Sequence, residues 1–387
     1  MRLYFAARAL GEERGLSPLE DSRMKIAQIA PLAESVPPKL YGGTERIVSY
    51  LTEALVDQGH EVTLFASGDS QTSAELVPIT PAALRLTPGI VDTIPYHMMM
   101  LDAVRKRADE FDALHFHIDL LHLPMIQDFI GRTVTTLHGR LDLPDLPPFY
   151  RCFGDHCLVS ISDHQRQPMP PVNWGATIYH GLPADLLAPS LGENEGYLAF
   201  LGRISPEKRP DRAIRIAARA GMELRIAAKI DAVDRAYWEE EIAPLVKLYP
   251  NIRFIGEINE RQKADFLGGA SALLFPIDWP EPFGLVMIEA MACGTPVIAF
   301  RCGSVPEVIE DGRSGFIVDS EDEAVEAVKQ IRHLERKMVR GVFDARFTAD
   351  RMAADYAALY HRLPGARTDA AWLRRRRGEE SELQIVA

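Results

Sequence analysis

Short runs of hydrophobic residues alternate along the chain with longer segments in which apolar residues recur every three or four positions. Such short runs are typical of strands buried on both faces of a sheet, and the longer segments are typical of the helices that cover them. The pattern begins abruptly at Met24, with MKIAQIAP, and continues almost to the end of the chain. It predicts strands at 25–30, 62–66, 113–117, 133–137, 158–161, 177–179, 197–201, 224–228, 252–255, 272–275, 296–300 and 316–318.

This alternation predicts an α/β fold built on parallel sheets with helices on both faces. The loop-like segment 181–196 interrupts it, after which the same pattern restarts, so we expect an N-terminal domain at 24–190 and a C-terminal domain at 191–347. Open parallel sheets bind ligands at the carboxyl ends of their strands, so the chemistry is expected in a cleft between the two domains.

Helix boundaries and the two chain ends can also be predicted. The first helix is expected to begin with Thr44 as its N-cap and to stop at Gly59. Residues 1–23 show no strand pattern and are interpreted as an extension, with Met24 as a candidate start of translation. Residues 364–387 form a polar, arginine-rich tail, which we expect to be solvated rather than bound to anionic lipid.

Composition narrows the possible functions. The net charge of −12 argues against a nucleic-acid-binding protein, which needs a basic face. The four cysteines form no CxxC pair, so a zinc ribbon or a dithiol redox site is not indicated. No apolar run approaches the roughly 20 residues that span a bilayer, and we expect a soluble, cytoplasmic protein.

The densest chemical signal is the stretch PEPFGLVMIEAMACGTPVIAF at 280–300. Glu281 lies in a proline-flanked loop and Glu289 in the helix that follows, so the two carboxylates can reach different parts of one ligand. A carboxylate that accepts two hydroxyl hydrogen bonds suits the vicinal diol of a ribose or a hexose. The amides of residues 283–285 lie at the start of the helix, where unpaired N–H groups favour anions or sugar oxygens. Two exposed surface glutamates are the alternative, which the surrounding Pro and Gly residues disfavour.

A second signal is LGRISPEKRP at 201–210, directly after a predicted strand. Arg203 offers bidentate hydrogen bonds and Lys208 a compact charge, a pair suited to a diphosphate. Arg209 is expected to be solvent-exposed. No DxD sequence occurs in the chain, so we expect these side chains, and not a divalent metal ion, to supply the positive charge.

Two weaker signals come from the first domain. Gly43 in YGGTER removes a side chain that would keep a phosphate or sugar from the backbone, although a tight turn explains it equally well. His138 ends a predicted strand and could donate to a sugar hydroxyl or a phosphate oxygen, or simply cap the strand. His115, His117 and His122 have no further ligand at matching spacing, which disfavours a zinc site.

Together these segments resemble the family 4 retaining glycosyltransferases, which have the GT-B fold. The matching text is YGGTER, TLHG, GRISPEKRPDRAI, FIGEI and EPFGLVMIEAMACGTPVIAFRCGSVPEVIEDGRSGFIVD, and it contains the E-x7-E motif of the family as Glu281 and Glu289. The resemblance covers residues 24–362. It implies two Rossmann-like domains that face each other across a cleft, and a C-terminal helix at 348–363 that crosses back to pack on the N-terminal domain.

The resemblance also implies a role for each candidate residue. Arg203 and Lys208 would bind the diphosphate of a donor, with Gly43 approaching from the opposite domain. Glu281 would contact the transferred sugar, and Glu289 would bind the ribose hydroxyls. The other expected site residues are His138, beside the reacting sugar carbon, and Phe283, Gly284 and Leu285, whose backbone would lie behind the sugar.

The implied activity is retaining transfer of a hexosyl group from a nucleotide-diphosphate sugar to an acceptor hydroxyl, without a metal or other cofactor. The segment 37–72 resembles bacterial members that glucosylate small molecules, which favours UDP-glucose as the donor. The alternatives are a GDP-mannose-dependent mannosyltransferase, a phosphorylase of the same fold and a non-catalytic nucleotide-sugar-binding protein. The acceptor is left open among small molecules, glycans and lipids. No nucleic-acid partner is expected, and any membrane contact would be weak and peripheral.

Overall fold

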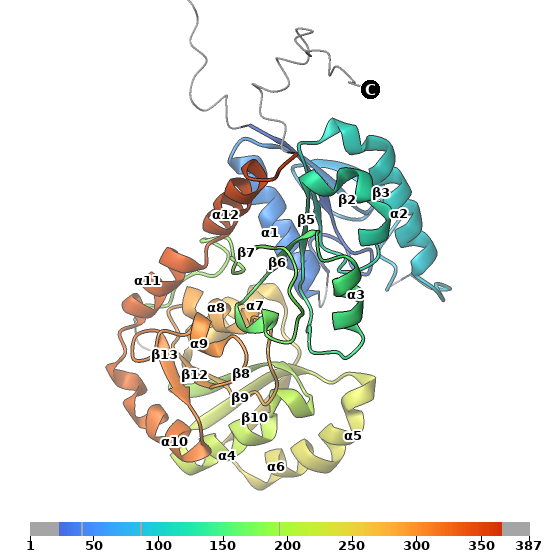
Figure 1. Cartoon of the computed structure of the whole chain (residues 1–387). Coiled ribbons are helices and arrows are strands. Elements are labelled where there is room, and N and C mark those ends of the chain that lie inside the picture. Colours follow the sequence, from blue (N-terminus) through green and yellow to red (C-terminus); the bar gives the residue numbers. More distant parts are fainter. Residues whose placement is uncertain (1–22, 40–41, 86, 193, 366–387) are drawn as a thin grey trace, which may run out of the picture.

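The computed structural model describes residues 23–39, 42–85, 87–192 and 194–365. The extension expected at 1–23 and the tail expected at 364–387 lie almost entirely outside the described residues. Two parallel sheets form two lobes, one above the other in Figure 1. This is the α/β architecture that the sequence predicts.

The first sheet has the strand order β3-β2-β1-β4-β5-β6-β7, and all of its strands pair in parallel. Its central strands are buried over almost their whole length, as expected when helices cover both faces. The strands are β1 (Lys25–Ile29), β2 (Glu61–Ser67), β3 (Glu75–Thr80), β4 (Ala113–Phe116), β5 (Thr133–Thr136), β6 (Cys157–Ser160) and β7 (Trp174–Thr177). Its helices include α1 (Gly43–Asp57), α2 (Ile94–Arg107) and α3 (Leu146–Cys152).

The second sheet has the order β10-β9-β8-β11-β12-β13, again with parallel pairing. Its strands are β8 (Tyr197–Arg203), β9 (Glu223–Lys229), β10 (Ile252–Gly256), β11 (Ala270–Phe275), β12 (Val297–Phe300) and β13 (Gly315–Val318). Its helices include α4 (Pro210–Ala220), α5 (Arg235–Tyr237), α6 (Ala243–Leu248), α7 (Glu260–Gly268), α8 (Leu285–Ala292), α9 (Val305–Val308) and α10 (Glu321–Gln330).

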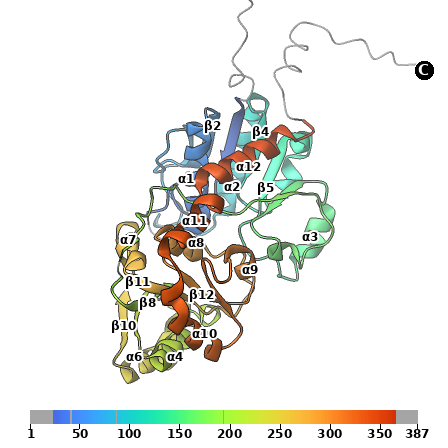
Figure 2. The same ribbon diagram turned by 90° about the vertical axis from the view of Figure 1, so that its left-hand side faces the viewer.

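The last two helices tie the lobes together. Helix α11 (Arg336–Arg346) packs on α8 of the second lobe, and α12 (Ala349–His361) packs on α1 of the first, as Figure 2 shows. Thr348 caps α12 by accepting a hydrogen bond from the Arg351 amide, 3.2 Å away. The helix expected to cross back to the N-terminal domain is therefore confirmed.

Three local predictions were wrong. Helix α1 begins at Gly43 with Gly42 as its N-cap, so Thr44 lies inside the helix. The strand expected at 177–179 lies at Trp174–Thr177, where the chain pairs with β6 at the edge of the sheet. Strand β3 was missed, because it is a half-exposed edge strand that contains Pro78 and so lacks the apolar run of a central strand.

Candidate active site

The structure brings together two residues that lie 73 positions apart in the sequence, Lys208 and Glu281. Lys208 ends a short turn after β8, and its ammonium group forms an ion pair with the Glu281 carboxylate. Trp279 donates from Nε1 to Glu281 Oε2 over 3.0 Å, and Lys208 Nζ lies 4.7 Å from the centre of the indole ring. The three side chains form one unit at the carboxyl end of the second sheet.

The loop that carries Glu281 is held by the segment that follows β12. The Glu281 carbonyl accepts from the Ser304 amide at 3.0 Å, and the Ser304 hydroxyl donates to the Phe283 carbonyl at 2.8 Å. Gly303, which precedes Ser304, has φ +57°, and a Cβ there would lie 2.4 Å from the Glu281 nitrogen. A glycine is therefore required for the loop to approach this closely.

Helix α8 starts directly after this loop. Gly284 is its N-cap in the left-handed conformation, so the amide donors of the first turn face the loop, as the sequence predicted for residues 283–285. A Cβ on Gly43 would meet Leu285 Cδ1 at 3.9 Å, which brings the first turn of α1 opposite the first turn of α8. Whereas the backbone of Phe283 belongs to the helix start, its side chain is buried and packs against His180 of the first lobe.

Glu289 lies deeper in α8, with only 6% of its side chain exposed. Its Oε1 atom lies 2.6 Å from Nζ of Lys263, a residue of α7 that the sequence did not single out. Burial works to lower the pKa of Lys263, but the carboxylates of Glu289 and Glu260 outweigh it and raise the pKa. Lys263 is therefore charged, and Glu289 is a buried, paired carboxylate.

Arg203 ends β8 but engages different acids from Lys208. It forms ion pairs with Glu207 of the same turn and with Asp234, the latter over 3.4 Å. The two cations expected to act together therefore share one turn, while each has its own carboxylate partner.

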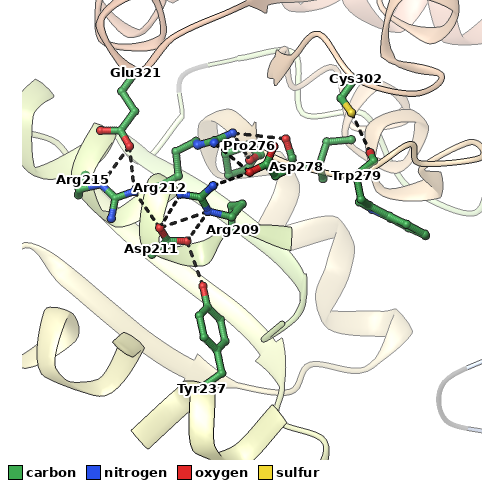
Figure 3. Close-up of polar contacts among 11 residues, drawn as sticks. Arg209, Asp211, Arg212, Arg215, Tyr237, Pro276, Asp278, Trp279, Cys302 and Glu321 are labelled. Atoms are coloured by element: carbon green, nitrogen blue, oxygen red, sulfur yellow. Dashed lines mark hydrogen bonds and ion pairs between the residues drawn. The ribbon is translucent and has the colours of Figure 1, made fainter. Parts of the chain in front are cut away.

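Arg209, expected to be solvent-exposed, is instead three-quarters buried. Its backbone is left-handed, with φ +53°, and its guanidinium binds Asp211 through Nε and Nη2 and Asp278 through Nη1 (Figure 3). Although burial works to raise it, hydrogen bonds from Arg209 and Arg215 lower the pKa of Asp211 to about 2. This charged network fixes the residue that follows Lys208.

On the first lobe, His138 follows β5 and belongs to a buried hydrogen-bonded chain. His117 Nε2 donates to Oε1 of the Gln28 side chain over 2.7 Å, which leaves His117 Nδ1 to accept from His138 Nε2 at 2.8 Å. Burial lowers the pKa of His138 to about 3 and that of His117 well below its usual value, so both rings are neutral. In this tautomer His138 Nδ1, which has no hydrogen-bond partner among the described residues, can only accept, and the expected donation by His138 to a substrate oxygen stays a prediction.

The three histidines considered for zinc are hydrogen-bonded within the lobe. His115 contacts Tyr360 and Thr136, and His122 contacts Thr135, each over 2.7 Å. In the described part of the chain, no three His, Cys, Asp or Glu side chains are placed to bind a metal ion together.

Sequence reasoning missed Asp119, which lies just beyond β4. Its φ is +53°, and the Leu120 amide donates to the Ile118 carbonyl over 2.8 Å, which makes Asp119 the centre of a tight γ-turn. Burial raises the pKa of Asp119 to about 6, although the His138 amide hydrogen-bonds to it. Its Oδ1 atom has no hydrogen-bond partner among the described residues. Strained, buried groups of this kind cluster at functional sites.

The chain is similar to known proteins along most of its length. The family model Glycosyltransferase Family 4 matches residues 41–174, and the model Glycosyl transferases group 1 matches residues 188–341. The D-inositol 3-phosphate glycosyltransferase 2 of Catenulispora acidiphila is 32% identical over 73% of this chain and 79% of the relative. The phosphatidyl-myo-inositol mannosyltransferase of Mycobacterium leprae is 26% identical over 82% of this chain and 89% of that protein.

Other similarities are shorter or concern the fold alone. The D-inositol 3-phosphate glycosyltransferase of Streptomyces scabiei is 35% identical, but the match spans 38% of this chain and only 33% of the relative. The crystal structure of Anabaena Alr3699/HepE in complex with UDP and glucose matches with a TM-score of 0.67 and 18% identity, over 88% of this chain and 100% of that one. Among the described helices, none is both long enough and apolar enough to cross a membrane.

Proposed function

Since this chain belongs to the glycosyltransferases of group 1 and family 4, with the GT-B fold, we propose that it transfers a hexosyl group from a nucleotide-diphosphate sugar to an acceptor hydroxyl. The observation that carries the proposal is the unit of Lys208, Glu281 and Trp279 beside the start of α8. It combines a cation, a carboxylate that can accept from hydroxyls and the first amides of a helix in one place, which is what a phosphorylated sugar requires.

Each group has a role in the proposed reaction. Lys208 and Arg203 bind the diphosphate, and Lys208 stabilises the charge that develops when the bond from the sugar carbon to the phosphate oxygen breaks. Glu281 positions the transferred sugar through its hydroxyls, and Glu289 binds the ribose. The positive charge comes from these side chains and from the helix start, so the proposed reaction needs no metal ion.

We propose that configuration is retained. The acceptor oxygen forms its bond to the sugar carbon on the face from which the diphosphate leaves, and its proton passes to the leaving phosphate oxygen. No protein base is required by this route. His138 is proposed to lie beside the reacting sugar carbon; its ring stacks on His180, which in turn packs against Phe283.

UDP-glucose is the proposed donor, supported by the complex of UDP and glucose with the structurally similar HepE. GDP-mannose is the second candidate, favoured by the mannosyltransferase name of the mycobacterial relative. We also propose a cytoplasmic location, which the free thiols of all four cysteines support.

Two measurements on the full chain test the proposal. A donor raises the melting temperature by mass action, so UDP-glucose should stabilise the protein more than GDP-mannose does. Slow release of UDP without acceptor, accelerated by an acceptor, is then expected. Sugar 1-phosphate formed from a glycan and inorganic phosphate would indicate a phosphorylase, and donor binding without any turnover a non-catalytic protein. Neither stabilisation nor turnover with any UDP- or GDP-sugar would overturn the proposal.

A further inference from the structure

A line of alternating charges crosses from the first lobe to the second beside the proposed ribose site. Arg46 of α1 forms an ion pair with Oε2 of Glu260, at the start of α7. Lys263, one turn further along α7, lies 3.3 Å from the same oxygen and 2.6 Å from Oε1 of Glu289. This series of ion pairs therefore runs from the first lobe to the carboxylate proposed to bind ribose.

These ion pairs differ from ordinary surface pairs because they are shielded from water. The exposed fractions are 16% for Arg46, 28% for Glu260, 15% for Lys263 and 6% for Glu289. Exposed pairs contribute little, whereas removing one partner of a buried pair leaves a charge uncompensated. Removing Lys263 would therefore leave the Glu289 carboxylate buried without its cationic partner.

The local structure of α7 fixes the middle of this series of ion pairs, Glu260 and Lys263. Asn259 caps α7 with a capping box: its side chain accepts from the Gln262 amide at 3.2 Å, and the Gln262 side chain accepts from the Asn259 amide at 3.0 Å. Glu260 and Lys263 lie in the turn that this box fixes. Arg46 is held in turn by a hydrogen bond with Tyr50, and the nearby Glu260 and Glu289 carboxylates favour its charge.

We propose that Lys263, held by Glu260 and Arg46, is a positioning residue that orients the Glu289 carboxylate toward the ribose hydroxyls of the donor. Lys263 occupies Oε1, and an ionised carboxylate has further lone pairs with which to accept hydroxyl hydrogen bonds. Because Arg46 belongs to the other lobe, recognition of the ribose depends on the two lobes being in contact. This inference rests on the proposed function, in which Glu289 binds ribose.

The test compares UDP with 2′-deoxy-UDP by calorimetry, since the two differ only in one ribose hydroxyl. A hydrogen bond from that hydroxyl to a charged group corresponds to a preference for UDP of about 10- to 100-fold in Kd. Lys263→Met should reduce this preference to about threefold or less, mainly by weakening UDP binding. Arg46→Gln should reduce it by a smaller factor, because it acts through two intermediate residues.

The chain offers a matched control. Lys329 also pairs with a glutamate three residues earlier on a helix of the second lobe, Glu326 at 2.5 Å, but both side chains are about 60% exposed. Lys329→Met should leave both dissociation constants unchanged. Lys263→Met/Glu289→Gln should bind no more weakly than Glu289→Gln alone, because Lys263 acts only through Glu289.

The outcomes separate the two proposals. If the wild-type protein binds neither UDP nor GDP, the proposed function fails. If it prefers GDP, the same comparison is made with GDP and 2′-deoxy-GDP. A folded Lys263→Met variant that keeps the wild-type preference for the ribose hydroxyl overturns the inference alone, as does a double variant that loses affinity beyond Glu289→Gln.

Discussion

The two lobes are built on the same kind of parallel sheet, yet the side chains that they contribute to the candidate site differ in charge. In the first lobe, burial lowers the pKa of His115, His117 and His122 well below the usual value, so the rings are neutral and bond to one another or to hydroxyls and amides. In the second lobe the buried groups are charged and paired, as in Lys208 with Glu281 and Lys263 with Glu289. We call the side chains of Lys208, Glu281, Lys263 and Glu289 the charged wall, and those of His115, His117 and His122 the neutral wall. Charged side chains suit a diphosphate, and neutral side chains suit the hydroxyls of an acceptor.

The largest expected effect tests the charged side. If UDP-glucose is the donor, Lys208→Ala should lower the rate of UDP release by about 10²- to 10³-fold, because it removes the cation proposed to stabilise the leaving diphosphate. Lys208→Arg should recover part of the rate, since the charge returns on a differently shaped group. Lys329→Ala is the control. A rate within threefold of wild type in folded Lys208→Ala would break the contrast between a charged and a neutral wall.

The sequence predicted the charged side better than the neutral one, for physical reasons. Glu281, Glu289 and Lys208 lie in segments whose Pro and Gly residues and helix start are visible in the text. Lys263 was missed because, in sequence, it is one more lysine on an amphipathic helix; its partner Glu289 is 26 residues away. Asp119 was missed because its distinguishing feature is a backbone angle, which the residue type does not reveal.

In the fold, too, some elements were predicted from the sequence and others were missed. Central strands such as β11 and β12 were predicted because both of their faces are buried and their sequences are therefore almost entirely apolar. Of the edge strands, β10 and β13 were predicted, whereas β3, which contains Pro78, was missed and β7 was misplaced. Pairing decides where such strands lie, and pairing is not local.

The second prediction concerns Asp119, a carboxylate of the first lobe that lies close to the neutral histidines. The pKa of Asp119 is about 6 in the folded chain, against 3.8 ordinarily, so ionising it opposes folding. This penalty is absent below about pH 4, grows between pH 4 and 6 and reaches about 3 kcal/mol above that range. Asp119→Asn, which tolerates the same backbone angle, should therefore be more stable than wild type by up to this amount at pH 7.5.

Urea unfolding at several pH values measures that difference. The gain from Asp119→Asn should shrink steadily as the pH is lowered from 6 toward 4. A gain that does not depend on pH would show that Asp119 is not ionised against an unfavourable environment.

A third, smaller effect comes from a single histidine of the neutral wall. His122 is buried, bonds to Thr135 over 2.7 Å and stacks on Phe116. Burial lowers its pKa, so below pH 6.5 the unfolded chain binds a proton that the folded chain does not, and stability falls as the pH falls. His122→Gln should make this fall shallower, by up to about 1.4 kcal/mol per pH unit between pH 6.5 and 5.5. An unchanged slope, measured by urea unfolding with pH 8 as the reference, would contradict burial of a neutral ring.

The smallest expected effect concerns Arg209 of the second lobe, where backbone strain can be separated from the loss of its ion pairs. Arg209 follows Lys208 in a left-handed conformation, which costs roughly 1–2 kcal/mol for a residue with a Cβ. Arg209→Ala and Arg209→Gly both lose the bonds to Asp211 and Asp278, but only glycine relieves the strain. Arg209→Gly should therefore be more stable than Arg209→Ala by about 1 kcal/mol in urea unfolding. Both variants should bind UDP-glucose more weakly than wild type, because the acids no longer fix the turn that carries Lys208. If Arg209→Gly binds the donor as well as wild type does, backbone shape alone places Lys208, and the ion pairs behind it serve only stability.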